Sequence, residues 1–183
     1  MPMPTVLQSW THWAYLAAFV ALLAGTGAAG SWIRNSDAVL RDAKTPRSAA
    51  LEWRSSPRRA QAIVDAWDAK GLLWPATRGT LIDTFLFIPF YSTLFALCGF
   101  WCAAGIDLRS PWHTVYLAMA WCGWVAGALD LIENAGILVE VRARWFFVAP
   151  ATAAAAWLKW AILAASVLMI VGRVVRALLA RWS

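Results

Sequence analysis

Four long apolar stretches constrain the fold of this chain more than any other feature of its sequence. They run from about 10 to 33, 81 to 106, 112 to 139 and 146 to 171. Each is long enough to cross the roughly 30 Å hydrocarbon core of a bilayer, which takes about 20 helical residues. Because lipid offers no hydrogen-bond partners, each crossing must satisfy its own backbone groups. The sequence therefore predicts an all-α, multi-pass bundle of four transmembrane helices in one membrane domain, residues 1–183.

The composition of the chain is typical of a membrane protein and excludes an ordinary soluble domain. Hydrophobic residues make up 61% of the 183 residues, whereas only 14% are charged. The 14 tryptophans favour the headgroup region at both faces of a bilayer. We expect membrane lipids as partners, with a membrane protein or a second copy of the chain as further candidates. No DNA-binding pattern accompanies the net charge of +6, so we expect no nucleic acid.

A polar segment, residues 34–80, separates the first two apolar stretches and holds nine of the 16 basic residues. Within it, Ser56, Pro57 and Gly71 are typical of a helix start and stop and predict a helix over about 57–70. The apolar side chains of that helix share one face, which predicts an amphipathic helix on the membrane surface or over the end of the bundle. These side chains are Ala60, Ile63, Val64 and Trp67.

The distribution of Lys and Arg over the loops predicts the orientation of the chain. With four spans, the long first loop and the third loop share one side. Leaving out Lys159, that side carries 11 of the 16 basic residues and the other side carries 4. The positive-inside rule places the more basic side in the cytoplasm, although the basic C-terminal tail argues the other way. We therefore expect a cell inner membrane with the long loop cytoplasmic.

Polar residues inside the third span mark a candidate site. Asp130, Glu133 and Asn134 follow helical spacings of i, i+3 and i+4, which places all three on one face. Gly123 and Gly127 continue that face as a G-x-x-x-G pattern, which lets another helix approach closely. A charged side chain costs about 2.5 to 3.5 kcal/mol at the centre of a spanning helix. The face must therefore point into the bundle.

Three further side chains lie at depths from which they can join this face. Lys159 is the one cation inside a span, and an ion pair with Asp130 is the contact that the cost of burial favours most. We expect Asp83 and Tyr91 of the second span to line the neighbouring wall. Two alternatives stay open. Thr80 and Asp83 resemble a capping box at a helix start, and the third-span cluster can fix helix register without any ligand.

Metal and cofactor chemistry finds little support in the sequence. Cys98, Cys102 and Cys122 fall inside apolar runs, where a buried thiol more often packs as a small hydrophobe than binds a metal. His12 and His113 fall near the same membrane surface, whereas paired haem ligands usually lie deeper. A Gly-rich phosphate loop, a Ser-His-Asp set and an H-E-x-x-H pattern are all missing from the sequence. We expect no metal and no cofactor.

Two stretches together resemble a known pattern. The second span reads "IDTFLFIPFYSTLFAL", in which the proline predicts a kink, and the third reads "GALDLIENAGIL". The pair is similar to a set of small bacterial four-helix membrane proteins of uncharacterised function, with Asp, aromatics, Pro and Tyr in one span and D-x-x-E-N in the next. The resemblance implies a polar pocket shared by the second and third spans. The matching positions are Asp83, Phe87, Pro89, Tyr91, Asp130, Glu133 and Asn134.

The function expected from these residues is binding. The leading hypothesis is an accessory protein whose acid and amide pocket binds a lipid-like or amphipathic small molecule, or a partner helix. One alternative is an intramembrane enzyme of isomerase or hydrolase type that uses its carboxyls as acid and base on an apolar substrate. Another is a structural subunit of a larger membrane complex. The candidate residues are Asp83, Tyr91, Asp130, Glu133, Asn134 and Lys159.

Overall fold

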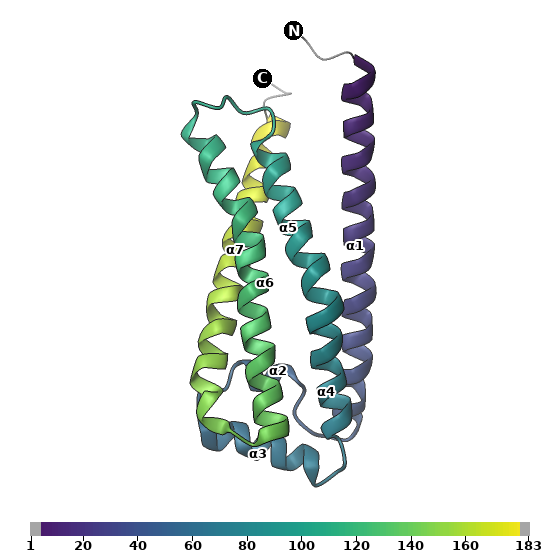
Figure 1. The fold of residues 1–183 in the computed structure, drawn as a ribbon, viewed down its shortest axis with the longest axis vertical. Coiled ribbons are helices and arrows are strands. Elements are labelled where there is room, and N and C mark those ends of the chain that lie inside the picture. Colours follow the sequence, from purple (N-terminus) through teal and green to yellow (C-terminus); the bar gives the residue numbers. More distant parts are fainter. Residues whose placement is uncertain (1–4, 180–183) are drawn as a thin grey trace.

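A computed structural model describes residues 5–179 of the chain as a bundle of long helices (Figure 1). Within these residues there is no strand, and four helical runs are long and apolar enough to cross a membrane. The predicted all-α bundle is therefore confirmed. The first helix begins and the last helix ends at one end of the bundle, whereas the long first loop lies at the other end, which we name the loop end. The four runs are His12–Asp42, Leu73–Ala103, Pro111–Ala143 and Phe146–Leu179.

The first helix, α1 (Thr5–Asp42), continues past residue 33, where the apolar stretch ends. Its last turns still bury side chains, including Ser36 and Leu40, so tertiary contacts extend the helix beyond its apolar part. It packs along the second run and leaves much of its own surface exposed. The α1 helix therefore flanks the other three runs and does not lie at their centre (Figure 1).

The second run is continuous through three elements: α4 (Leu73–Ile82), the π-helical turn η1 (Asp83–Phe87) and α5 (Ile88–Ala103). It begins eight residues before the predicted start at 81. The proline of its first turn, Pro75, is tolerated there because that position needs no backbone N–H. Pro89 cannot donate to the preceding turn, and η1 lies directly before it. The irregularity expected at Pro89 thus takes the form of a π-helical turn.

The third run, α6 (Pro111–Ala143), packs against both α5 and α7 (Ala149–Leu179). A short 3-10 turn, η2 (Phe146–Val148), joins α6 to α7. A Cβ atom added at Gly123 would lie 2.7 Å from the Ala96 backbone nitrogen. One added at Gly127 would lie 2.9 Å from the Ser92 Cβ. The α5 helix therefore packs directly against the backbone of α6 at these glycines, as the G-x-x-x-G pattern predicts.

The polar loop folds across the loop end of the bundle as α2 (Ala49–Glu52) and α3 (Pro57–Asp68) (Figure 1). The α3 helix buries the four apolar side chains named above, and they join an apolar cluster with side chains of α1, α2, α6 and α7. The Trp67 indole donates to the Pro46 carbonyl at 2.8 Å, and Arg144 pairs with Asp65 at 2.8 Å and with Asp68. The α3 helix thus covers the bundle end, and its location in a membrane surface stays a prediction.

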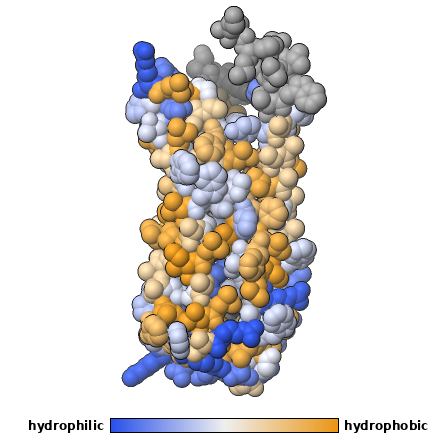
Figure 2. Space-filling view, in the orientation of Figure 1, coloured by the Kyte–Doolittle hydropathy of each residue, from blue (hydrophilic) through white to orange (hydrophobic). Residues whose placement is uncertain are grey.

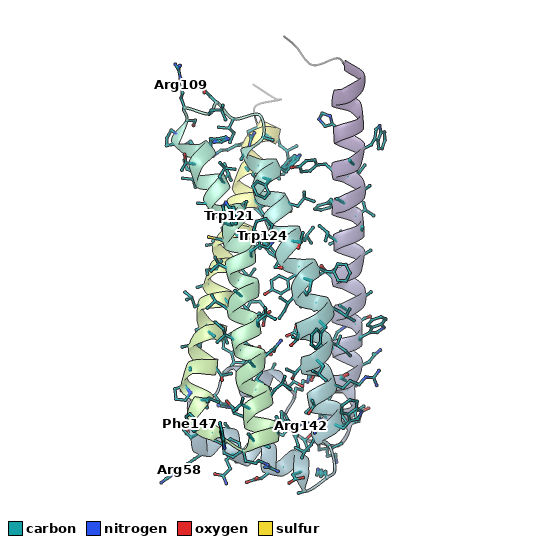
Figure 3. All side chains as sticks on the ribbon, viewed as in Figure 1. Arg58, Arg109, Trp121, Trp124, Arg142 and Phe147 are labelled. Carbon is teal, nitrogen blue, oxygen red and sulfur yellow. The ribbon has the colours of Figure 1, made fainter. Side chains whose placement is uncertain are left out.

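The surface shows an apolar middle between polar ends. Figure 2 shows apolar residues along the length of the bundle, with hydrophilic residues gathered toward its ends. In Figure 3, Arg58 and Arg142 lie at the loop end and Arg109 lies at the opposite end. Several tryptophans, among them Trp74, Trp101 and Trp121, expose more than half of their surface. An apolar girdle of this kind suits a bundle surrounded by lipid.

Candidate functional site

A buried ion pair forms the centre of the candidate site, between α6 and α7. The Lys159 ammonium donates to Asp130 Oδ1 at 2.6 Å, and both side chains are almost fully buried. The pair expected from the sequence is therefore present. The Tyr91 hydroxyl of α5 donates to the other carboxylate oxygen, Oδ2, at 2.7 Å. Both oxygens of Asp130 are thus hydrogen-bonded, and three separate runs meet at this one side chain.

Glu133 is the second acid at the same ammonium. Its Oε2 lies 2.7 Å from the Lys159 Nζ, yet the contact lacks hydrogen-bond geometry, and Oε2 accepts no hydrogen bond from the described residues. The side chain is 1% exposed, so water cannot supply the missing donor from outside. Glu133 therefore lies at ion-pairing distance from Lys159, but its Oε2 lacks a hydrogen bond.

Asn134 joins the third span to the π-helical turn of the second. Its amide nitrogen donates to Asp83 Oδ2 at 2.9 Å and to Thr84 Oγ1 at 3.1 Å. The capping-box interpretation of Asp83 is wrong, because the helical run begins at Leu73 and Asp83 lies well inside it. The Thr80 hydroxyl instead donates to the Ala76 carbonyl at 3.3 Å. Asp83 thus belongs to the polar cluster and does not cap a helix.

Glu52 is a member of the cluster that sequence reasoning missed. It comes from α2 in the polar loop, and its carboxyl lies within hydrogen-bonding reach of the Glu133 carboxyl. Burial raises the pKa of Glu52 above its ordinary value, against the opposing charge of Lys159. Asp37 of α1 holds the chain just before α2, because its Oδ1 accepts from the Ser48 backbone N–H at 3.2 Å and hydroxyl at 2.8 Å. Glu52 could not be predicted as a site residue, because a single acid in a short loop helix belongs to no periodic pattern in the sequence.

The cluster holds more acceptor oxygens than donor hydrogens. Four carboxyls offer eight oxygens, whereas Lys159, Tyr91 and Asn134 together offer six donor hydrogens. Two carboxyls share a hydrogen bond only with a proton between them. One ammonium therefore serves four carboxyl groups. The four carboxyls are those of Glu52, Asp83, Asp130 and Glu133.

A tryptophan group lies beside the cluster on the outer face of α7. The Trp53 ring meets the Trp157 ring edge to face at 4.8 Å and stacks near the Trp160 ring at 6.3 Å between centroids. The Lys159 Nζ lies 5.5 Å from the Trp160 ring centre. All three rings are more than a third exposed. The cluster is thus next to aromatic side chains of the kind that lie at the headgroup level of a bilayer.

The six residues predicted for the site, Asp83, Tyr91, Asp130, Glu133, Asn134 and Lys159, all meet in this cluster. Their role in binding a ligand stays a prediction. In the part of the chain that the structure describes, no three His, Cys, Asp or Glu side chains form a group that could hold a metal ion. Comparisons with family models, with curated proteins and with solved structures find no match. The site is therefore interpreted from its own geometry.

Proposed function

We propose that this protein is an integral membrane protein that binds an amphipathic molecule at the acid and amide cluster, and that the cluster recognises an ammonium group of that molecule. The observation that supports the proposal is the surplus of carboxyls around the single ammonium of Lys159. Carboxyl oxygens without donors are costly in a medium of low dielectric. A ligand ammonium would supply the missing donors, and its positive charge would suit a group of carboxyls.

The origin of Glu52 favours binding over a purely structural network. A network that fixes helix register needs side chains on the spans alone. Glu52 belongs to α2 in the loop, so its carboxyl adds nothing to the register of the spans. It does add a further acceptor at the loop end, beside the exposed Trp53. A headgroup could enter the cluster there while its apolar tail lies along the outer face of α7.

The proposed orientation keeps the cluster near the cytoplasmic face of an inner membrane. The loop end carries Arg58 and Arg142, and Arg109 lies at the opposite end (Figure 3). The larger number of basic residues in the loops at the loop end is what the positive-inside rule associates with the cytoplasm. The amphipathic ligand would therefore come from the cytoplasmic leaflet.

The proposal is tested by comparing two single-chain probes that differ only in the headgroup, dodecylamine and dodecanol. We expect dodecylamine to raise the thermal unfolding midpoint of the purified protein in a non-ionic detergent, because a ligand that binds only the folded state stabilises it. Dodecanol should have little effect. Glu52→Gln should remove most of the shift, whereas Asp42→Asn, which changes an exposed acid at the end of α1, should leave it unchanged.

Three results would count against the proposal. One is an equal shift with both probes, and another is an undiminished amine shift in Glu52→Gln. The third is that Glu133→Gln and Asp130→Asn proteins keep the fold and every co-purifying molecule, as identified by mass spectrometry. If Glu52→Gln does not fold, Asp83→Asn provides the same comparison from the opposite wall of the cluster.

A second candidate function rests on the continuous contact between proton-carrying groups. Tyr91, Asp130, Lys159 and Glu133 follow one another at 2.7, 2.6 and 2.7 Å. Such a series suits acid and base catalysis on an apolar substrate. Tyr91→Phe keeps the ring and removes the hydroxyl, so an isomerase or hydrolase would lose turnover while the amine shift persists. A pure binding protein would show no turnover in either form.

A further inference from the structure

A second candidate site lies at the end of the bundle opposite the loop end, between α1, α5 and α7. It is a groove of about 760 Å³, which lies within the range of about 300–1,000 Å³ that is usual for ligand pockets. Its walls are mostly apolar and include Leu16, Phe19, Leu97, Trp101 and Ile170. The α1 helix forms one wall, and its exposed outer surface places the groove at the side of the bundle. An apolar groove at that place is open to the hydrocarbon of a membrane.

Two arginines border this groove. Arg173 lines the groove and also a neighbouring cavity of about 340 Å³, which Arg176, Trp112 and Ser110 line as well. The Arg176 guanidinium lies 4.8 Å from the centre of the Trp112 ring. Within residues 5–179, no carboxylate lies at ion-pairing distance from either arginine. The positive charge of this rim is therefore available to an anion.

We infer that the groove holds an acyl chain of an anionic phospholipid whose phosphate lies against Arg173 and Arg176. The apolar walls suit the chain, and the planar guanidinium donors match phosphate oxygens in geometry and charge. Trp112 lies beside the arginines, as an interfacial side chain would beside a headgroup. The charge and shape of the site thus point to one occupant, with its head at the rim and its tail in the groove.

This lipid site differs from the acid and amide cluster in its location and in the charge of its side chains. The cluster is rich in carboxyls and lies toward the loop end, whereas the rim carries two arginines and lies at the opposite end. The inference therefore does not depend on the proposed function. A merely basic surface would attract any anionic lipid weakly and would lose it on extraction. A groove that also encloses the chain should retain a defined lipid.

Native mass spectrometry of the full chain in a non-ionic detergent tests the site. Phosphatidylglycerol and phosphatidylcholine with identical chains serve as probes. We expect the wild type to retain phosphatidylglycerol about tenfold better. Arg173→Gln and Arg176→Gln should each weaken that retention about fivefold, since one basic residue near an anionic headgroup contributes about that factor. Arg109→Gln is the matched control, because Arg109 is exposed at the same end but does not line either cavity (Figure 3).

A groove variant separates lipid binding from phosphate binding. Cys98 lines the groove, so Cys98→Phe should narrow it and reduce retention of both lipids while both arginines remain. Glycerol phosphate, which carries the head without the chains, should not displace the lipid. The inference is overturned if both arginine variants keep the preference, if Arg109→Gln loses it equally, or if glycerol phosphate competes as well as the lipid. Arg173→Lys, which keeps the charge but not the planar fork, should show a smaller loss than Arg173→Gln.

Discussion

Two of the buried acids of α6, Asp130 and Glu140, have opposite surroundings although one helix carries both. Asp130 has both oxygens hydrogen-bonded and an ammonium at 2.6 Å. Glu140 is 0% exposed, and among the described residues neither of its oxygens has a hydrogen-bond partner. The Thr152 hydroxyl of the facing α7 helix lies beside the Glu140 carboxyl, but it donates to the Val148 carbonyl instead. Glu140 is therefore buried at an energetic cost that Asp130 avoids.

Replacing Glu140 with methionine should stabilise the protein. Methionine fills a similar volume without an unpaired polar group, so we expect the free energy of unfolding to rise by about 1–3 kcal/mol. Thermal unfolding in one detergent measures the change. Glu140→Gln, which removes the charge but keeps a buried polar group, should give a smaller gain. A lower unfolding midpoint for Glu140→Met would contradict this prediction.

The contact between α5 and α6 positions the cluster. Gly123 and Gly127 let α5 approach the α6 backbone, and Tyr91 and Asp130 are carried by these same two helices. The hydrogen bond between Tyr91 and Asp130 requires that approach, because a side chain at either glycine would push the helices apart. The G-x-x-x-G pattern, which is typical of close helix packing, therefore also determines the geometry of the polar site.

Gly123→Ala should destabilise the bundle, because the new Cβ would lie 2.7 Å from the Ala96 nitrogen and 2.8 Å from the Ser92 oxygen, and both atoms belong to backbone. We expect a loss of about 1–3 kcal/mol in the free energy of unfolding. Gly172→Ala is the matched control, since a Cβ there meets no atom within 4 Å. The control should be neutral or stabilising through helix propensity. Equal effects of the two substitutions would refute close packing at Gly123.

The molecule as a whole couples its polar loop to its buried cluster. The α3 helix is held over the bundle end by Trp67 and Arg144, and α2 brings Glu52 to Glu133. Docking of the loop therefore places a carboxyl in a poorly solvated position. The protonation of that carboxyl should control how firmly the loop docks.

The stability of the protein should fall as pH rises above the ordinary pKa of Glu52, near 4.5. Burial raises the pKa of Glu52, so the folded state binds more protons than the unfolded state above that pH. The loss continues until the pH passes the raised value, and it levels off thereafter. Thermal unfolding of the wild type and of Glu52→Gln across this range measures the effect. The difference between them should vary with pH, and parallel curves would contradict the prediction.

Local properties of the chain were sufficient to predict the spans and the polar face. The length of an apolar run decides whether a helix can cross a membrane, and helical spacing decides which side chains share a face. Asp130, Glu133 and Asn134 therefore pointed into the bundle before any neighbour was known. The pair between Lys159 and Asp130 also followed, because Lys159 is the one cation inside the four predicted spans.

The start of the second run at Leu73, the π-helical turn at Asp83 and the entry of Glu52 depended on contacts between distant segments. Helical spacing gives the direction of a side chain around its own axis, but not the rotation and depth of the neighbouring helix. A short helix such as α2 has no stable conformation of its own, so its position comes from what it docks against. The polar face of α6 could therefore be predicted from the sequence. The position of Glu52 beside that face is known only from the folded structure.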